Sequence, residues 1–157
     1  MHIVKPIILF DLNGTLCHRD KKDRKVFIRP FIQNLILLKD LYTLGIYTSM
    51  MEYNAWKIIK QIEGLVGEEL FDRSYIFCRN YTIPFTDEEI EKYNISPWKT
   101  KKSIEYILKD EFAVIVDDEE VKIVEKDRAI IIPSYYEFNR KDRELYNLVN
   151  SLVGINE

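Results

Sequence analysis

Short apolar segments alternate along this chain with longer segments of helical periodicity. The short segments read as buried strands at residues 7–10, 46–48, 75–78, 113–116 and 129–132. Apolar positions three and four residues apart predict helices at residues 30–44, 55–65, 101–109 and 140–153. Strands that are apolar throughout are typical of parallel sheets that are covered on both faces. The pattern therefore predicts an α/β fold: a doubly wound (Rossmann-like), mainly parallel sheet with helices on both faces.

Two segments interrupt this alternation. Residues 18–25 read as a charged loop. Residues 79–100 are irregular and contain Pro84, Pro97 and the run Thr86-Asp87-Glu88-Glu89, which is typical of a capped helical turn. An irregular segment of that length is usually a lid or an insertion. Because no repeat or linker is visible, we expect residues 1–157 to form a single domain with a lid or insertion at 79–100.

Composition narrows the class of protein. The chain has 157 residues, of which 46% are hydrophobic and 31% charged, as in a globular domain with one core. A net charge of −3 does not indicate a nucleic-acid partner or an acidic membrane surface. No apolar stretch approaches the roughly 20 residues that span a bilayer, and the first strand follows too soon for a cleavable signal. We therefore expect an intracellular protein, with Cys17 and Cys78 as free thiols.

Chemically active side chains follow three of the predicted strands. Asp11 follows residues 7–10, Thr48 ends residues 46–48, and the pair Asp117-Asp118 follows residues 113–116. Lys101 stands just before the helix that leads into the third of these strands. The carboxyl ends of parallel strands form the ligand-binding edge of an open α/β sheet. The set predicts an enzyme that forms an aspartyl phosphate.

Each of these signals also has a simpler interpretation. Asn13-Gly14 is a strong hairpin signal, although the charged residues that follow lack strand-like alternation. Asp117-Asp118 and Thr48 could cap helices, and Lys101 could be one more solvated lysine. A receiver-like domain also uses acids, threonine and lysine, but in the inverted order. The convergence of all the signals favours the phosphotransfer site.

The expected chemistry explains the residue types. Phosphoryl transfer depends mostly on positioning and charge stabilisation. Asp11 would attack phosphorus, and Mg²⁺ would bridge Asp11 and a substrate oxygen, held also by Asp118 or Asp117. Thr48 would donate a hydrogen bond to the phosphate, and Lys101 would neutralise the developing charge.

The order Asp-x-x-Gly-Thr, Thr, Lys, Asp-Asp resembles the haloacid dehalogenase (HAD) superfamily, so the fold is expected to be HAD-like. Finer motifs resemble one branch, the RNA polymerase II C-terminal-domain phosphatases and their NIF-type relatives. These motifs are Thr15-Leu16-Cys17-His18, Arg29-Pro30-Phe31, Tyr47-Thr48-Ser49 and Ile76-Phe77-Cys78-Arg79. The similarity runs over about residues 5 to 133.

This resemblance implies roles for the same residues. Asp11 would be the nucleophile, and Asp11, Asp118 and the backbone carbonyl of Asn13 would bind the metal. Thr48 and Lys101 would hold the phosphate. The identity of the substrate is not carried over from the family: we expect a phosphomonoester, for which a phosphoprotein is one candidate.

Asn13 departs from the family pattern. Phosphatases of the family carry an aspartate at this position, which exchanges protons with the leaving group and the water. The amide of Asn13 cannot do so, and losing a general acid–base group typically lowers the rate about 10²- to 10⁴-fold. We therefore expect slow or atypical turnover. The alternative is a catalytically degenerate, phosphatase-like module that binds proteins.

Two further features bear on binding. The aromatic residues at 75, 81, 85, 93 and 98 could form a recognition surface, although ordinary core and lid packing is the favoured interpretation. The mixed-charge run at residues 19–25 is typical of a solvated loop, and it could instead guide a phosphorylated or nucleic-acid substrate towards Asp11.

Overall fold

The centre of the protein is a five-stranded, wholly parallel sheet. The computed structural model describes residues 4–109, 111–136 and 139–154. The strand order is β5-β4-β1-β8-β9. The strands are β1 (Ile7–Phe10), β4 (Thr43–Tyr47), β5 (Ile76–Phe77), β8 (Ala113–Asp117) and β9 (Ala129–Ile131). The predicted fold class is confirmed, and each predicted strand has a counterpart in this sheet.

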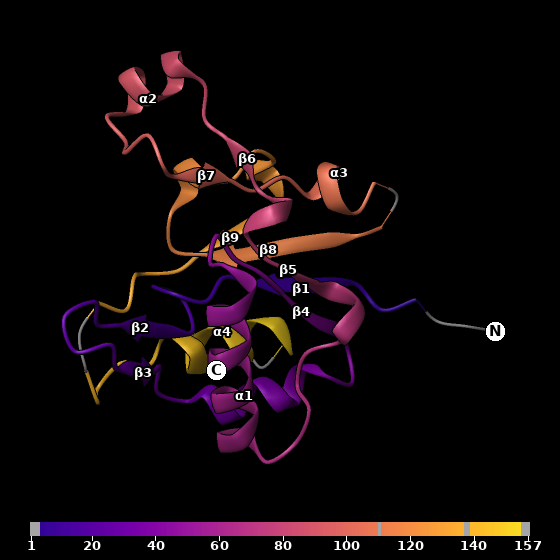
Figure 1. Ribbon diagram of the computed structural model, residues 1–157. Coiled ribbons are helices and arrows are strands. Elements are labelled where there is room, and N and C mark those ends of the chain that lie inside the picture. Colours follow the sequence, from indigo (N-terminus) through magenta and orange to yellow (C-terminus); the bar gives the residue numbers. More distant parts are fainter. Residues whose placement is uncertain (1–3, 110, 137–138, 155–157) are drawn as a thin grey trace.

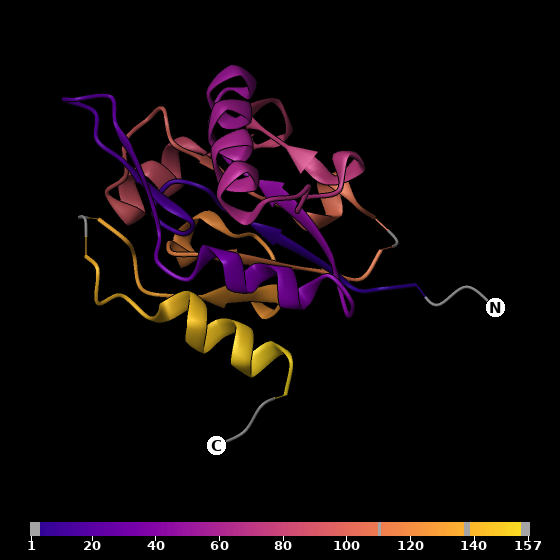
Figure 2. The same ribbon diagram turned by 90° about the horizontal axis from the view of Figure 1, so that it is seen from below.

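Helices cover both faces of the sheet (Figure 1). One face carries a 3₁₀ helix (Ile32–Leu38), α1 (Glu52–Val66) and α4 (Glu144–Leu152). The 3₁₀ helix and α4 lie side by side beneath it (Figure 2). The other face carries α3 (Ile104–Ile107) and short turns. Further single turns of 3₁₀ helix lie at Arg73–Tyr75, Arg79–Tyr81, Glu120–Lys122 and Lys126–Arg128. No helix in the described ranges is both long and apolar enough to cross a membrane.

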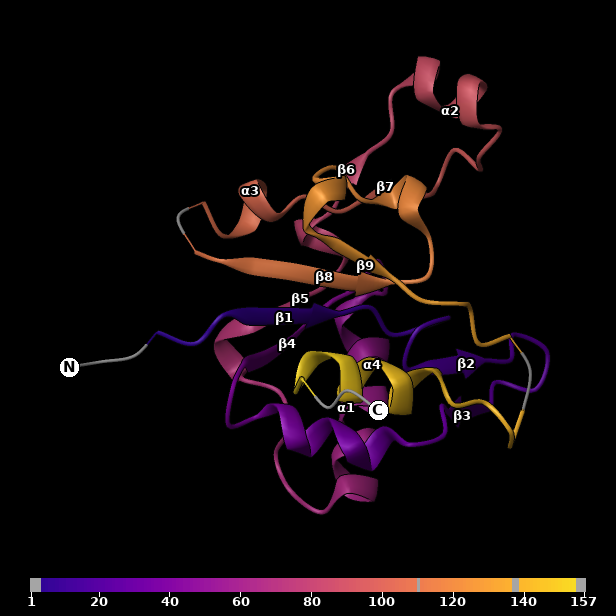
Figure 3. The same ribbon diagram turned by 180° about the vertical axis from the view of Figure 1, so that it is seen from behind.

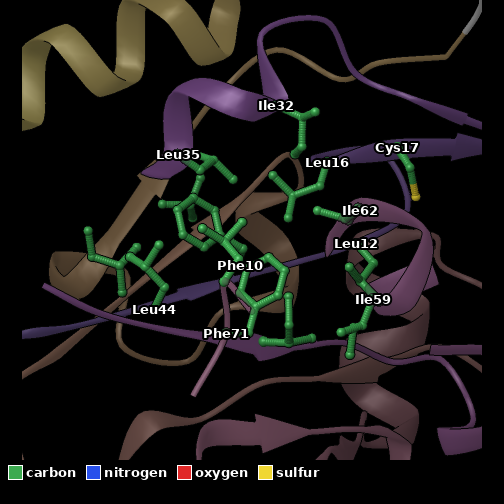
Figure 4. Packing of buried hydrophobic residues seen from close by; sticks show 14 of the residues in the cluster. Phe10, Leu12, Leu16, Cys17, Ile32, Leu35, Leu44, Ile59, Ile62 and Phe71 are labelled. Atoms are coloured by element: carbon green, nitrogen blue, oxygen red, sulfur yellow. The ribbon is translucent and has the colours of Figure 1, made fainter. Parts of the chain in front are cut away.

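The apolar strands build two cores, one on each face. Ile8 and Phe10 of β1 point into the larger core, whereas Ile7 and Leu9 point into the smaller one. This division follows from the two-residue period of a strand. In the larger core Phe10 packs among side chains of the 3₁₀ helix, α1 and the loops (Figure 4). Burial on both faces is the reason that β1 is apolar at every position.

Two antiparallel ribbons extend from this body. One is a hairpin of β2 (Cys17–Arg19) and β3 (Val26–Ile28), which lies beyond the carboxyl end of the sheet (Figure 3). The other pairs β6 (Ile83–Pro84) with β7 (Thr100–Lys101). It carries α2 (Asp87–Tyr93) away from the body (Figure 1). We call residues 79–101 the arm. The predicted cap at Thr86 is confirmed, because its hydroxyl accepts the amide of Glu89 while the Glu89 carboxylate accepts the amide of Thr86.

Several predicted boundaries are wrong. The helix expected up to residue 44 ends at Leu38, because the chain already enters β4 at Thr43. Gly45 lies inside that strand, where a Cβ would come 2.4 Å from the backbone oxygen of Tyr75. The helix expected at residues 101–109 is reduced to α3, because Lys101 belongs to β7. Part of the predicted charged loop at 18–25 forms β2. Both cysteines are free thiols, as predicted.

Candidate active site

The candidate site lies where three neighbouring strands end. In the parallel register, Phe10 of β1 is the partner of Ile46 in β4 and of Val116 in β8. Asp11 and Asp117 directly follow these positions, and Thr48 comes two residues after Ile46, so all three reach the same edge of the sheet. The chain runs from β1 to β4 and β5 on one side, and then returns to β8 on the other. Such a switch point in strand order is where open α/β sheets bind ligands.

Asp11 is buried in a network of hydrogen bonds. Its Oδ1 accepts a hydrogen bond from Nζ of Lys102 at 2.9 Å, and its Oδ2 accepts one from Oγ1 of Thr15 at 3.2 Å. Its backbone amide donates to the oxygen of Val116 at 2.9 Å, which fixes β1 against β8. Both the side chain and the backbone of Asp11 are thus held in place.

Asp117 orients the lysine and the turn that follows β8. Its Oδ2 accepts Nζ of Lys102 at 2.5 Å. Its Oδ1 accepts the backbone amides of Asp118 and Glu119 at 2.7 and 3.0 Å. Asp117 therefore holds the turn after β8, but it does not cap a helix, because the residue that caps the following 3₁₀ turn is Glu119.

Asp118 completes the acidic group and lies nearest to solvent. Its Oδ2 accepts a hydrogen bond from Ser134 at 2.7 Å, and its Oδ1 accepts one from Thr15 at 3.3 Å. Thr15 thus offers one hydroxyl to both Asp11 and Asp118. Gly14 passes directly beneath Asp118 with φ +92°, and a Cβ at Gly14 would lie 2.4 Å from Oδ2 of Asp118. Only glycine combines that backbone conformation with that approach.

Burial and mutual repulsion perturb these acids. Burial, and then the charge of Asp117, raise the pKa of Asp11 to about 7, although Lys102 opposes the rise. Burial also raises the pKa of Asp118. Asp117 behaves differently, because Lys102 outweighs its burial and lowers its pKa. The carboxylates of Asp11 and Asp117 in turn outweigh burial and raise the pKa of Lys102. The lysine therefore stays charged.

The acids fit a hard divalent cation. One ligand oxygen each from Asp11, Asp117 and Asp118 lies within 4.8 Å of the other two. Three ionised acids and one lysine leave a charge of −2 (−3 + 1), which a divalent cation would offset. Carboxylate oxygens are the ligands that Mg²⁺ and Ca²⁺ prefer. Since Asp117 is occupied by Lys102 and two amides, Asp11 and Asp118 are the residues best placed to hold the ion.

Lys102, and not the predicted Lys101, reaches the acids. Nζ of Lys101 lies 2.8 and 3.0 Å from the two carboxylate oxygens of Glu89 in α2, and this pair is partly exposed. Lys102 is 1% exposed. Successive side chains of an extended segment point in opposite directions, so only one of two adjacent lysines can face the acids. The lysine that contacts the acids therefore lies one position after the lysine that the sequence analysis chose.

Thr48 lies at the predicted place. It is buried, and its backbone amide donates to Phe77 at 2.9 Å. Its Oγ1 accepts the amide of Met50 at 3.1 Å, whereas the residue that caps α1 is Met51. The helix-capping interpretation of Thr48 is therefore wrong. Accepting that amide leaves the hydroxyl proton of Thr48 free to be donated to a ligand.

Asn13 is exposed and faces the β2–β3 hairpin. Its Oδ1 accepts the backbone amide of Arg19 at 2.9 Å. The loop that carries Asp11 is thereby tied to the start of the hairpin. The side chain of Asn13 has no titratable proton near neutral pH, and its catalytic and metal-binding roles stay predictions.

Arg29 is a supporting residue that the motif analysis left without a role. It is fully buried and forms a bidentate ion pair with Asp142 at 2.9 and 3.0 Å. It also donates to the backbone oxygens of Thr15 at 3.0 Å and Pro133 at 2.7 Å. Since Thr15 and Ser134 both contact Asp118, Arg29 holds together the two segments that position this acid.

Tyr47 attaches the arm to the sheet beside the site. Its hydroxyl donates to the backbone oxygen of Tyr81 at 2.5 Å and accepts the amide of Ser103, next to Lys102, at 3.1 Å. The arm leaves some of its aromatic side chains in solvent: Trp98 is 71% exposed, whereas Phe85 is buried. The favoured prediction of core and lid packing is therefore right for Phe85 and wrong for Trp98.

Comparison with known proteins identifies a protein family that this chain matches. A family model described as NLI interacting factor-like phosphatase matches residues 6–157. The chain is similar to the solved structure of Fcp1, an essential RNA polymerase II CTD phosphatase, with a TM-score of 0.58 and 17% identity over 96% of this chain and 48% of that one. It is also similar to fission yeast Fcp1 bound to beryllium fluoride, with a TM-score of 0.56 and 18% identity over 96% and 50% of the two chains. The chain thus spans about half the length of these structures, and identities this low show a shared fold. No curated protein matches.

Proposed function

Because this chain belongs to the NLI interacting factor-like phosphatase family, within the HAD superfamily, we propose that it is a Mg²⁺-dependent phosphatase whose nucleophile is Asp11. The observation that carries the proposal is the group of three acids around one buried lysine, at the switch point of the sheet. The substrate is a phosphomonoester, and a phosphorylated protein is the class that the family favours.

The reaction begins with a carboxylate oxygen of Asp11. It forms a bond to phosphorus while the bond from phosphorus to the leaving oxygen breaks, and an acyl phosphate results. The hydroxyl of Thr48 and the ammonium group of Lys102 would donate to the phosphate oxygens. Mg²⁺ held by Asp11 and Asp118 would supply further charge stabilisation. Water then attacks the acyl phosphate, which releases phosphate and restores the carboxylate.

Asn13 determines which substrates are turned over. An alkyl leaving group such as serine needs a proton, which the Asn13 amide cannot give. An aryl leaving group departs more easily as an anion. We therefore expect aryl phosphates to react faster than alkyl phosphates, and the acyl phosphate to persist because its hydrolysis lacks a base.

The test is Mg²⁺-dependent hydrolysis of p-nitrophenyl phosphate by the native chain and by Asp11→Asn. Asp40→Asn is the matched control, because Asp40 is exposed and lies just before β4, at the opposite edge of the sheet. Asp11→Asn should lower turnover at least about 100-fold, whereas Asp40→Asn should not change it. Acid quenching should trap phosphorylated Asp11 in a burst. Equal rates for the native chain and Asp11→Asn would refute a nucleophilic role.

A second candidate is a phosphatase-like binding module. The observation that favours it is the bond from the Arg19 amide to Asn13, at the position where the family carries its proton-exchanging aspartate. Such a module would bind a phosphorylated protein through Lys102, Thr48 and Mg²⁺ without hydrolysing it. Mg²⁺-dependent binding of a phosphopeptide, with no turnover in either the native chain or Asp11→Asn, would favour the module.

A further inference from the structure

A cationic groove lies beside the candidate active site. It has a volume of about 580 Å³ and runs between the β2–β3 hairpin and the first turns of α1. The hairpin contributes Arg19, Lys21, Arg24 and Val26, and α1 contributes Tyr53, Asn54, Lys57 and Ile58. Four of the eight lining residues are thus basic, and none is acidic.

These four basic side chains are available for a ligand. Among the described residues, none of Arg19, Lys21, Arg24 and Lys57 has a carboxylate within 4.0 Å. Lys57 instead lies over the ring of Tyr53, with Nζ 4.2 Å from the ring centre. The hairpin acid Asp20 accepts the amide of Lys22 at 2.9 Å and so holds the turn. Within the described part of the chain, no ion pair therefore neutralises the positive charge of the groove.

The groove is directly connected to the site. Its residue Arg19 donates its backbone amide to Asn13, two positions after Asp11. The other wall, α1, starts at Glu52, four residues after Thr48. One wall is therefore hydrogen-bonded to Asn13, and the other starts four residues after Thr48. The two walls are also joined to each other, because Gln61 of α1 donates to the backbone oxygen of Val26 in β3 at 3.4 Å. A substrate protein whose phosphate lies at Asp11 would therefore have this groove next to it.

We propose that this groove binds an acidic segment of the substrate protein next to its phosphorylated residue, and that it thereby selects acidic phosphoproteins. The groove would take carboxylates or a second phosphate, since both are anions that lysine and arginine bind. This inference rests on the proposed function, because it assigns the substrate class of the same site.

A protein segment fits better than a nucleic acid. Residues 19–25 carry five basic and two acidic side chains, a local charge of +3, while the whole chain carries −3. A long polyanion would extend past this limited patch, whereas a few acidic residues would not. On the arm, α2 opens with three acids, Asp87, Glu88 and Glu89, which would repel a longer polyanion.

The experiment compares short phosphotyrosine peptides that differ only in their flanks. One has acidic flanks, one has the matching glutamine and asparagine flanks, and one carries a second phosphate. Their affinities are measured by fluorescence anisotropy in the Asp11→Asn background, which does not consume them. We expect the acidic and doubly phosphorylated peptides to bind about tenfold more tightly than the neutral one at low salt, and this preference to shrink as salt is added.

Reversing the charges of the groove residues tests whether the preference for acidic peptides arises in the groove. The variant Lys21→Glu/Arg24→Glu/Lys57→Glu should reduce it to less than about twofold. The control Lys5→Glu/Lys92→Glu/Lys109→Glu makes the same change in net charge outside the groove and should retain the preference. In the active chain, kcat/KM for each peptide is divided by the value for p-nitrophenyl phosphate on the same variant, so that folding defects cancel.

Several outcomes would overturn the proposal. These are equal binding of all peptides, a preference that survives groove reversal, or one that the control loses equally. Tighter, groove-dependent binding of a 5′-phosphorylated oligonucleotide would show that the partner is a nucleic acid. Absence of turnover with an intact binding preference would refute the phosphatase proposal alone, and the groove would stand.

Discussion

Lys102 is held between Asp11 and Asp117, nearly inaccessible to water. Replacing it by methionine would leave buried carboxylates without their cation. We expect Lys102→Met to lower the free energy of unfolding by on the order of 3 kcal/mol, and added Mg²⁺ to restore part of it. The matched variant Lys101→Met removes only the partly exposed pair with Glu89, which should cost less than about 1 kcal/mol. Urea unfolding of both variants measures the difference, and equal losses would contradict the assignment.

In the proposed mechanism, proton exchange depends on the residue at position 13. We expect Asn13→Asp to raise turnover of alkyl phosphates at least about tenfold, because a carboxyl group can protonate the leaving oxygen. Steady-state rates with p-nitrophenyl phosphate and a phosphoserine peptide test this, and the alkyl substrate should gain more. A variant that is no faster would mean that another residue supplies the proton, or that the new carboxylate stays bound to the amide of Arg19.

For the individual residues of the candidate site, the sequence predicts the residue types better than their positions. The acids could be placed because they directly follow apolar strands, and the structure brings Asp11, Asp117 and Asp118 together. The lysine could not, because Lys101 and Lys102 differ only in which way an extended chain turns them. The role of Arg29 was also hidden, since its partner Asp142 is 113 residues away.

The turn after β1 depends on one glycine. Gly14→Ala would force a Cβ into the carboxylate of Asp118 at a positive φ. We expect this variant to lose more than about 1 kcal/mol of stability and to bind Mg²⁺ more weakly. Gly64→Ala is the control, because nothing lies within 4 Å of its Cβ inside α1, and it should gain about 0.5–1 kcal/mol. Thermal unfolding and Mg²⁺ titration of both would decide, and similar behaviour would refute the steric argument.

Elements buried on both faces could be predicted from their apolar runs, whereas short ribbons could not. In the sequence Gly45 looks like the end of a helix, yet it lies within β4. Glycine is required there because the backbone oxygen of Tyr75 comes too close for a side chain. Cys17–Arg19 carries two polar residues and gives no strand signal, and the pairing of this strand with β3 is a tertiary contact that the local sequence does not show. The helix was predicted to start at residue 101, but Thr100 and Lys101 pair with β6, and α3 begins only at Ile104.

The molecule as a whole should respond to pH through Asp11. Its pKa rises from 3.8, the ordinary value of an aspartate, to about 7 in the folded protein without a bound metal. Between these values the folded state binds more protons than the unfolded state, so this group's contribution to stability is present below about pH 4 and is lost as pH rises to about 7. The loss should be on the order of 2–4 kcal/mol.

Urea unfolding at several pH values, with chelator, measures this effect as the difference between the native chain and Asp11→Asn. The native curve should fall more steeply than the variant curve between about pH 4 and pH 7. Parallel curves would show that the pKa of Asp11 is not raised. Mg²⁺ should flatten the native curve, because a cation favours the ionised carboxylate.

The link from Arg29 to Asp142 sets a limit on shortening the protein. Cutting the chain after β9 would keep all five strands of the sheet and the acidic group, but it would remove α4 from the larger core. It would also remove Asp142 and Pro133, two of the partners of the guanidinium of Arg29, which lies beneath the turn that carries Thr15. Truncation at the carboxyl end should therefore disturb the candidate site as well as the core face that α4 covers.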